Sequence, residues 1–490
     1  MPKSQPVLPT DPQCAAPREL PAAGGSVWMI GIGGCGMCGL ARMLVGRGIG
    51  VAGSDGMPSD TTRSLQEHGI DVTGGCDDLP ADLDLIIASA AVPHDHPELQ
   101  QAAARGVPRA IYAEALGMVQ MDRLGVSIAG THGKSTTAAM LAWILLDTGM
   151  DPGYIIGANC EQIGGGSRTG AAVTPIGPHS GEGGILITEA CEFNRSFHHH
   201  RPTIGLINNV EEDHLDMYGS LDAIVEAFAG FASLLPPAED GGSLLIAHDG
   251  ARRQSITSPL KCRVSTFGFH PEADYQVAWD AAARRAGILR DGMWVTQWTN
   301  TMPGAHNALN AAAAVILAHQ LGVEWEEAAD AATRFRGLDR RMERLGTRTA
   351  PDGVVTVYSD YGHHPTEIEK TLHALRAAED PDRLVCVFQP HQHSRTRFLL
   401  DQFAESFSAA DEVIVPEIYF VRDSEAEKKK VNAMDLVERL QARGVTARHV
   451  ANFSDIVSVL QADLRAGDLL VVMGAGPVWT IGRDFMDTGP

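Results

Sequence analysis

The stretch GTHGKSTTAAML occupies residues 130–141, between the apolar segment GVSIAG and a segment of helical character. A strand, a glycine turn, Lys134 and then Ser135 opening a helix form the pattern of a phosphate-binding loop. The amides of residues 131–136 are expected to point inward, with Lys134 near the terminal phosphates and the Ser135 hydroxyl on Mg2+. The spacing is a shortened variant of G-x-x-x-x-G-K-[ST], because Ile128 occupies the place of the first glycine. The alternative is a capped helix start with an incidental lysine.

Two further side chains are candidate ligands for that metal. Glu189 follows the strand-like ILIT, and His214 follows LINN in INNVEEDHLD. Because the carboxyl ends of parallel strands meet at one edge of a sheet, both loops are expected to approach Lys134. The alternatives are a helix-capping or surface acid for Glu189 and an ordinary surface histidine for His214.

A second glycine loop stands near the N-terminus. Gly31, Gly33 and Gly36 form G-x-G-x-x-G between a strand ending in VWMIGIGG (28–35) and a helical segment, and Asp55 ends the next strand. This pattern is typical of NAD binding, although its physics suits any diphosphate. The alternative is a strand-to-helix turn that holds no ligand.

Other clusters of Cys, His and Lys lack the spacing expected of a metal or redox site. Cys35 and Cys38 form C-x-x-C, but no second pair of Cys or His is near, so packing is favoured over metal or redox use. The histidine runs at 198–200, 363–364 and 391–393 lack the spacing of a zinc site, since adjacent side chains point in different directions. The lysines at 428–430 indicate a solvated loop.

The alternation of strand and helix patterns predicts three α/β domains with mainly parallel sheets. We expect a disordered tail at 1–25 and domains at 26–123, 124–333 and 334–490. The second domain ends in the alanine-rich helix HNALNAAAAVILAHQLG, with Gly322 as its C-cap. Strands of the third domain are expected at VVTVYSD, LVCVF, DEVIVP and DLLVVM.

Composition excludes several classes of protein. The chain has 490 residues with 39 Lys and Arg against 61 Asp and Glu, and its net charge of -22 argues against a nucleic-acid binder. Eight cysteines are too few for a disulfide scaffold. No stretch is apolar enough for a membrane span or a secretory signal, which predicts a cytoplasmic protein with no membrane partner.

Seven ordered blocks bring these motifs together: GTHGKSTT, TEACEFNRSF, NNVEEDHLD, MPGAHNALNAAAA, DRRMERLG, SDYGHHPTEI and FQPHQHSRTR. Over residues 26–490 the chain resembles the Mur ligase family, the ATP-dependent amide-bond formers of peptidoglycan synthesis. The resemblance implies a Rossmann-like UDP-sugar-binding domain, a P-loop ATPase-like central domain and a Rossmann-like C-terminal domain. It also implies that the first glycine loop holds the UDP of a sugar nucleotide, without nicotinamide.

The resemblance implies roles for individual residues. ATP would be held by Gly130, Thr131, His132, Gly133, Lys134, Ser135, Thr136, His306, Asn307, Asn310 and Arg341. Magnesium would be held by Ser135 and Glu189, with His214 reaching a second metal near the substrate carboxylate. The sugar nucleotide would lie on Gly31, Gly33, Gly34, Gly36 and Asp55, and the amino acid on Tyr361, His363 and Arg395. Asp360 would be the acid of the inter-domain cleft, and the catalytic set comprises Lys134, Glu189, His214, Asp360, His363 and Arg395.

The reaction implied by the resemblance joins L-alanine to the lactyl carboxylate of UDP-N-acetylmuramate through an acyl phosphate. Domain closure would assemble the site, and the protein would be a monomer or weak homodimer. Within the family, the alternatives are a recycling ligase that adds a tripeptide to the same sugar nucleotide and a ligase that adds D-glutamate to a later precursor. From other classes, an NAD-dependent oxidoreductase and a non-enzymatic nucleotide sensor are the alternatives.

The chain departs from the family pattern at a few positions. Gln392 stands in PHQHSRT where many members have arginine, which leaves Arg395 as the clearer fork for the amino-acid carboxylate. The alternative for Arg395 is a solvated basic patch with Arg397. Cys191 and Asn194 replace acids of the metal loop, while Glu189 and Glu192 are retained and Ser135 replaces a commoner threonine.

Overall fold

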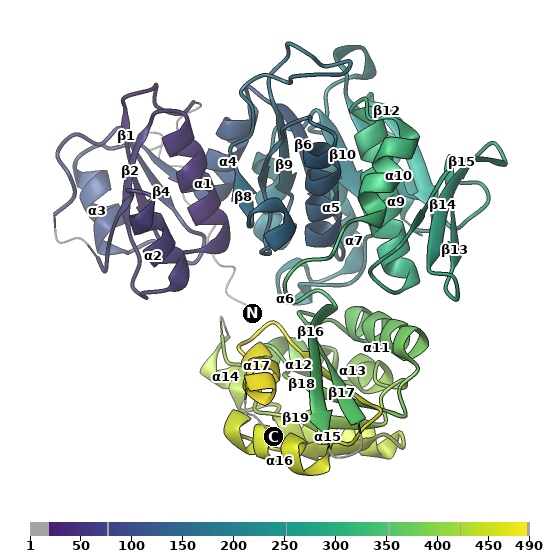
Figure 1. The fold of residues 1–490 in the computed structure, drawn as a ribbon. Helices are drawn as coiled ribbons and strands as arrows, with labels where there is room; N and C mark the ends of the chain where they lie inside the picture. Colours follow the sequence, from purple (N-terminus) through teal and green to yellow (C-terminus); the bar gives the residue numbers. More distant parts are fainter. Residues whose placement is uncertain (1–18, 76–77, 251, 351–352, 422, 488–490) are drawn as a thin grey trace.

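The computed structural model describes residues 19–75, 78–250, 252–350, 353–421 and 423–487. Figure 1 shows two α/β domains side by side and a third domain below them, against the middle domain. Most of the predicted tail lies outside the described residues, whereas Leu20 packs against the core of the first domain. Across the described ranges, no helix has the length and apolar character needed to cross a membrane.

The first domain has a five-stranded parallel sheet in the order β3-β2-β1-β4-β5. Its strands are β1 (Ser26–Ile30), β2 (Gly50–Ser54), β3 (Asp71–Thr73), β4 (Leu85–Ala88) and β5 (Arg109–Ile111). Its helices are α1 (Cys35–Gly46), α2 (Asp60–Glu67), α3 (Pro97–Ala104) and α4 (Tyr112–Gln120). The glycine loop after β1 lies where the strand order reverses, the usual place for a ligand in such a sheet.

The middle domain has a ten-stranded sheet in the order β15-β14-β13-β12-β11-β10-β6-β9-β7-β8. Its strands are β6 (Leu124–Ala129), β7 (Gly153–Ile155), β8 (Ser167–Arg168), β9 (Ile185–Glu189), β10 (Ile204–Ile207), β11 (Ser243–Ala247), β12 (Arg263–Gly268), β13 (Tyr275–Asp280), β14 (Arg285–Arg290) and β15 (Met293–Thr299). Its helices are α5 (Lys134–Asp147), α6 (Leu215–Tyr218), α7 (Leu221–Ala232), α8 (Arg253–Thr257), α9 (Ala305–Gln320) and α10 (Trp325–Thr333), with short 3-10 turns at Glu161–Ile163, Phe193–His199 and Ala238–Asp240.

The sequence analysis did not find the antiparallel ribbon β13–β15. Its signal is the turn Asp291-Gly292, where both residues have positive φ (52° and 74°) between two alternating segments. The prediction of the alanine-rich helix is confirmed: α9 is buried along most of its length, and Gly322 follows it with φ 102°. Small side chains on α9 let it pack closely against α5, so the phosphate loop has a rigid support.

The third domain has a six-stranded sheet in the order β16-β17-β21-β18-β19-β20, parallel except for β16. Its strands are β16 (Glu343–Ala350), β17 (Gly353–Asp360), β18 (Arg383–Phe388), β19 (Glu412–Val415), β20 (Thr446–His449) and β21 (Asp468–Met473). Its helices are α11 (Pro365–Glu379), α12 (His393–Phe398), α13 (Leu400–Glu405), α14 (Glu425–Lys428), α15 (Ala433–Ala442), α16 (Phe453–Asp463) and α17 (Trp479–Asp487). The ends of β17 and β18 carry the residues that face the middle domain.

Candidate active site

The loop 130–133 connects β6 to α5 and takes backbone conformations that favour glycine. Gly130 and Gly133 have φ of 140° and 82°, and a Cβ on Gly133 would lie 2.4 Å from Asn310 Oδ1. Asn209 holds the loop from the next strand, because its Oδ1 accepts the His132 N–H at 2.8 Å and its Nδ2 donates to the His132 carbonyl at 3.1 Å. The loop is therefore shaped before a ligand arrives.

Lys134 lies inside this loop with its ammonium group satisfied by the protein. The Nζ atom donates to the Thr131 carbonyl at 3.0 Å and to Glu192 Oε2 at 3.0 Å. Burial disfavours the charge, but the Glu192 carboxylate outweighs it and raises the pKa of Lys134. The lysine is thus a fixed cation at the mouth of the loop.

The predicted metal ligands lie on neighbouring loops. Glu189 ends β9, where its Oε1 accepts the Gly157 N–H at 2.6 Å, and among the described residues no hydrogen bond to its Oε2 is found. Glu192, Asp213 and His214 have ligand atoms within 4.8 Å of one another, which is a set able to hold a cation. Glu192 and Asp213 were not singled out from the sequence as metal ligands.

A chain of contacts runs from the phosphate loop to the third domain. From Lys134 it passes to Glu192, whose Oε1 lies 4.0 Å from His214 Nε2. His214 Nε2 lies 3.6 Å from Asp213 Oδ2, and Asp213 Oδ1 accepts from Arg395 at 2.9 Å. Asp213 and Arg395 are nearly buried, at 9% and 8% exposure of their side chains. The predicted phosphate, metal and amino-acid residues are therefore brought together.

Several residues of this site have strained backbones. His214, Met342 and Gln392 have positive φ (52°, 47° and 66°), which non-glycine residues rarely adopt. Such conformations cost energy and concentrate at functional sites. All three lie on loops at the boundary between the middle and third domains.

A cavity of about 390 Å³ opens between α5, α9 and the third domain. It contains most of the residues that resemblance assigned to ATP: His132, Gly133, Ser135, Thr136, His306, Asn307, Asn310 and Arg341, together with Asp360. Burial raises the pKa of Asp360 to about 6, although its carboxylate accepts two backbone N–H groups, and burial lowers that of His306 to about 4. The His306 ring is therefore uncharged at neutral pH. A nucleotide phosphate in this cavity would meet the positive charges of Arg341 and Lys134 and none from His306.

A polar network lines the wall between α5 and α9. Asn208 Nδ2 donates to Thr137 Oγ1 at 3.1 Å, Thr137 donates to Asn310 Oδ1 at 3.4 Å, and Asn310 donates to Asn307 Oδ1 at 3.2 Å. Within the part of the chain that the structure describes, the buried Asn208 Oδ1 has no hydrogen-bond partner. An unpaired buried acceptor on a cavity wall fits a site that a ligand completes.

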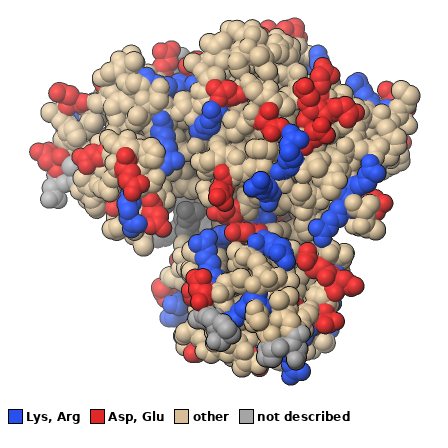
Figure 2. Space-filling model, in the orientation of Figure 1, with Lys and Arg blue, Asp and Glu red and all other residues tan. Residues whose placement is uncertain are grey.

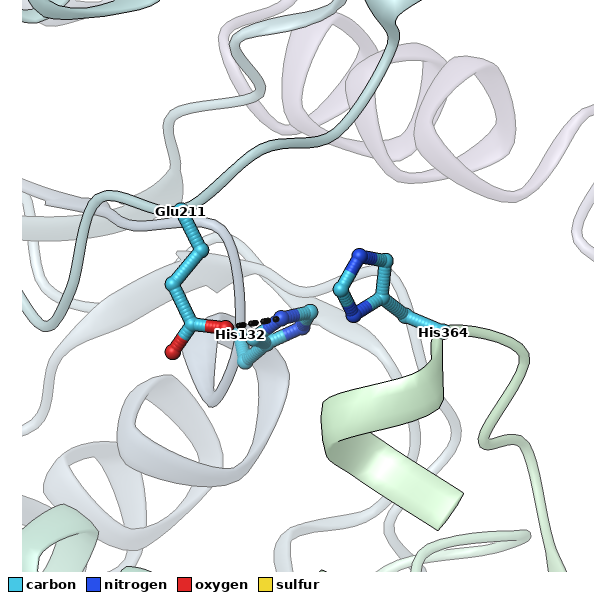
Figure 3. Close-up of side chains that lie close together, drawn as sticks. All are labelled: His132, Glu211 and His364. Carbon is cyan, nitrogen blue, oxygen red and sulfur yellow. Dashed lines mark ion pairs between the residues drawn. The ribbon is translucent and has the colours of Figure 1, made fainter. Parts of the chain in front are cut away.

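His132 joins the phosphate loop to the third domain (Figure 3). Its Nδ1 lies 3.0 Å from Glu367 Oε1, its Nε2 lies 3.5 Å from Glu211, and its ring lies 4.8 Å from that of His364. His364 caps α11 and its Nε2 donates to the Glu212 carbonyl at 3.0 Å. Burial opposes a charge on His132, but the carboxylates of Glu367 and Glu211 prevail and raise its pKa to about 9.

This contact predicts a pH dependence of domain docking. Because the folded pKa of His132 lies above its ordinary 6.5, its stabilising charge is complete below pH 6.5 and is lost as the pH rises through about 9. We expect a histidine Cε1 resonance, absent from His132→Gln, to titrate near pH 9 in NMR spectra. Glu367→Gln should move this midpoint down. An unshifted midpoint in Glu367→Gln would contradict the assignment.

The predicted amino-acid residues lie around Arg395 and the end of β17. The guanidinium groups of Arg340 and Arg341 each lie 4.8 Å from the centre of the Tyr361 ring. Burial lowers the pKa of His363 to about 3, so its ring is neutral, with its Nδ1 3.4 Å from Glu367. Tyr361 also contacts His363, with the two ring centres 5.3 Å apart.

The first glycine loop keeps its shape through Asp55 and close packing. Asp55 Oδ2 accepts the Gly33 N–H at 2.9 Å, and a Cβ on Gly36 would lie 2.6 Å from the Tyr112 hydroxyl. Gly31 has φ 74°, and Gly34 caps α1. Asp55 thus supports the loop itself, and Gly36 is required by packing whether or not a diphosphate binds.

The Cys35 and Cys38 thiols have the properties of packing residues. Burial raises the pKa of Cys35 to about 11 and raises that of Cys38. The thiolate is the form that binds metals and attacks disulfides, so raised pKa values disfavour both uses.

The boundary of the third domain is lined with charges of both signs. Figure 2 shows basic and acidic side chains facing one another where the lower domain meets the rest of the molecule. The pairs include Lys370 with Glu211 at 3.7 Å and Arg284 with Glu379 at 3.5 Å. Thr366 Oγ1 also donates to Glu211 Oε2 at 2.8 Å. This polar boundary suits a contact that opens and closes.

Comparison with known proteins identifies the class of this molecule. Residues 26–121 match the Mur ligase family catalytic domain, 128–318 match the Mur ligase middle domain, and 340–476 match the Mur ligase glutamate ligase domain. The chain belongs to the Mur ligase family. This confirms the predicted resemblance and the fold class.

Its relatives define a narrower group. A UDP-N-acetylmuramate–L-alanine ligase from Kineococcus radiotolerans is 38% identical, over 94% of this chain and 96% of its own length. One from Lachnospira eligens is 36% identical, over 94% and 97%. The solved UDP-N-acetylmuramate-alanine ligase from Thermotoga maritima has a TM-score of 0.72 and 26% identity, over 94% and 98%. A murein peptide ligase from Psychrobacter arcticus, 23% identical with a TM-score of 0.67, shares the fold.

Sequence reasoning missed three acids of the site, Glu211, Asp213 and Glu367, and named Glu192 only as an acid retained in the metal loop. Glu211 and Asp213 lie beside His214 in EEDH, and Glu367 lies three residues after His364. Their proximity to predicted residues along the chain is the signal that could have found them. The residues that these acids pair with lie in other segments of the chain, so the local sequence does not reveal them.

Proposed function

We propose that this protein is an ATP-dependent ligase that joins L-alanine to the lactyl carboxylate of UDP-N-acetylmuramate. One observation carries the proposal: a continuous series of contacts links Lys134, Glu192, His214, Asp213 and Arg395 across two domains. A phosphate loop, a cation-binding cluster and an arginine fork at one place suit phosphoryl transfer followed by amide formation. The ligases named among its relatives support the choice of substrates.

In the first step, the lactyl carboxylate attacks the γ-phosphate of ATP, which gives an acyl phosphate and releases ADP. Lys134 is placed to stabilise the charge on the phosphates, after exchanging its contacts with Glu192 and the loop carbonyls for phosphate oxygens. The ADP moiety would lie in the cavity between α5 and α9, where Asn208 offers its unpaired Oδ1.

The residues of the site fit a magnesium ion. Ser135 supplies a buried hydroxyl at the start of α5, and Glu189 has one carboxylate oxygen that no loop amide takes. The cluster of Glu192, Asp213 and His214 offers a second position. When bound, Mg2+ supplies charge neutralisation to the transferred phosphoryl group.

In the second step, the amine of L-alanine attacks the acyl carbon, and the tetrahedral intermediate expels phosphate, which takes up the proton that the nitrogen loses. Arg395 would hold the amino-acid carboxylate in place of Asp213, which is its partner in this structure. The protein then accelerates this step mainly by positioning the reactants and neutralising charge, because phosphorylation has already created the leaving group.

The decisive test measures phosphate release with UDP-N-acetylmuramate and ATP while the acceptor is varied. We expect release with L-alanine to exceed that with glycine, L-serine, D-glutamate and the tripeptide L-alanyl-γ-D-glutamyl-meso-diaminopimelate. Activity with the tripeptide alone would identify a recycling ligase. ATP binding without phosphate release for any acceptor would identify a nucleotide-binding protein that is not an enzyme.

A further inference from the structure

A cluster of potential metal ligands lies outside the site described above. His248, His270 and Glu272 each offer one ligand atom, and these atoms lie within 4.8 Å of one another. The two imidazole rings are stacked, with their centres 4.9 Å apart and an interplanar angle of 14°. His248 follows β11 and His270 follows β12, which are adjacent parallel strands. Two separate loops therefore converge on one point.

The hydrogen bonds around His248 indicate which of its ring nitrogens is free to bind a metal. Its Nδ1 lies 3.3 Å from Thr266 Oγ1, whose single proton is donated to Asp274 Oδ2 at 2.9 Å. Nδ1 must then be the donor to Thr266, so the neutral ring keeps its lone pair on Nε2. A metal-binding histidine is usually oriented in this way by a hydrogen bond from its other nitrogen.

The electrostatic surroundings also suit a cation. The carboxylates of Asp249 and Glu272 and the guanidinium of Arg253 all lie near the His248 ring. The Glu272 N–H donates to His270 Nδ1 at 3.2 Å, so Nδ1 carries the lone pair of this ring, and a metal bound at Nδ1 would replace this hydrogen bond.

We propose that His248, His270 and Glu272 form a binding site for a borderline divalent metal of the Zn2+ class. Imidazole nitrogens with a carboxylate are the donor set of such ions, with water completing a tetrahedral shell. The site clamps together the loop after β11 and the loop after β12.

These loops also form part of the wall of the nucleotide cavity. Asp249, Gly250, Phe267 and Gly268 line the cavity, next to the two histidines in the chain. A metal that fixes both loops lowers their conformational entropy before the nucleotide binds. The nucleotide then loses less free energy in ordering them. We expect the metal and the nucleotide to bind with positive coupling, an expectation that rests on the proposed nucleotide site.

The metal site is tested with Zn2+ alone on the full-length chain without an affinity tag. Isothermal titration should give one fewer Zn2+ per chain for His270→Ala and for His248→Ala than for the unaltered protein. Thr266→Val, which removes only the orienting hydroxyl, should weaken this Zn2+ by roughly 10–100-fold. His94→Ala, an exposed histidine in the first domain, is the matched control and should bind as the unaltered protein does. Identical isotherms for His270→Ala and the unaltered protein would overturn the proposal.

The coupling is tested by ADP titration with and without Zn2+. Zn2+ should tighten ADP binding about 5-fold in the unaltered protein and leave it unchanged in His270→Ala. An equal response of the two proteins would overturn the coupling. Failure of ADP to bind either protein would instead count against the proposed nucleotide site, which the Zn2+ isotherms do not involve.

Discussion

Replacing Lys134 with alanine should abolish phosphate release, with a loss of at least about 10³-fold in kcat. The ammonium group is the phosphate-facing cation fixed within the loop by the Thr131 carbonyl and Glu192. Without it, the charge that develops on the transferred phosphoryl group meets only backbone amides and the metal. Steady-state phosphate release with saturating substrates measures the effect.

The same substitution leaves Glu192 buried at 5% exposure without its counter-charge. Losing one member of a buried ion pair costs on the order of 3–5 kcal/mol of folding free energy, so the single variant is expected to be less stable. The double variant Lys134→Ala with Glu192→Gln separates the two effects, because it removes the unpaired charge. It should regain thermal stability and stay inactive. Recovery of activity together with stability would show that Lys134 has only a structural role.

Replacing Arg395 with alanine should raise the KM for L-alanine on the order of 100-fold, with a much smaller effect on the KM for ATP. Arg395 lies on α12, and its buried guanidinium donates to Asp213 at 2.9 Å. Asp213 belongs to the cation-binding cluster with Glu192 and His214. Arg395→Lys keeps the charge but loses the planar pair of donors, so it should recover only part of the affinity. Initial rates with varied L-alanine measure both variants.

A structural explanation of that result is tested through Asp213. Arg395→Ala strands the Asp213 carboxylate, which is 9% exposed and whose pKa the guanidinium holds well below its usual range. Asp213→Asn alone keeps the arginine and removes this competing carboxylate. If Arg395 binds the amino acid, Asp213→Asn should not raise the KM for L-alanine, because the carboxylate that it removes competes for the guanidinium. Equal increases of that KM in both variants would indicate that the ion pair serves only to hold the domains together.

The sequence predicted the backbone conformation of the loop 130–133 well because its constraints are local. Gly130 and Gly133 adopt the positive φ that only glycine takes easily, and Lys134 and Ser135 follow at the first turn of the helix. The ends of β9 and β10 placed Glu189 and His214 near the same edge, as parallel strands require. Each of these inferences uses residues whose spacing in the chain sets their spacing in the molecule.

The ribbon β13–β15 and three acids of the site, Glu211, Asp213 and Glu367, were not predicted, for different reasons. The ribbon carried a local signal in Asp291-Gly292 that the sequence analysis overlooked. Glu367 has only its position three residues after His364 as a signal, because its partner His132 lies more than 200 residues away in the sequence. Its role appears only when α11 is docked against the phosphate loop.

By itself, the sequence determined the three α/β domains, the glycine turn before α5 and the family, since these depend on short-range backbone geometry and on ordered motifs. Only the tertiary structure decided which charges meet across the domain boundary: His132 between Glu211 and Glu367, and Arg395 on Asp213. The physical reason is that the strength of an ion pair and the shift of a pKa depend on distance and burial. Neither quantity is set until segments more than 150 residues apart, such as Asp213 and Arg395, pack together.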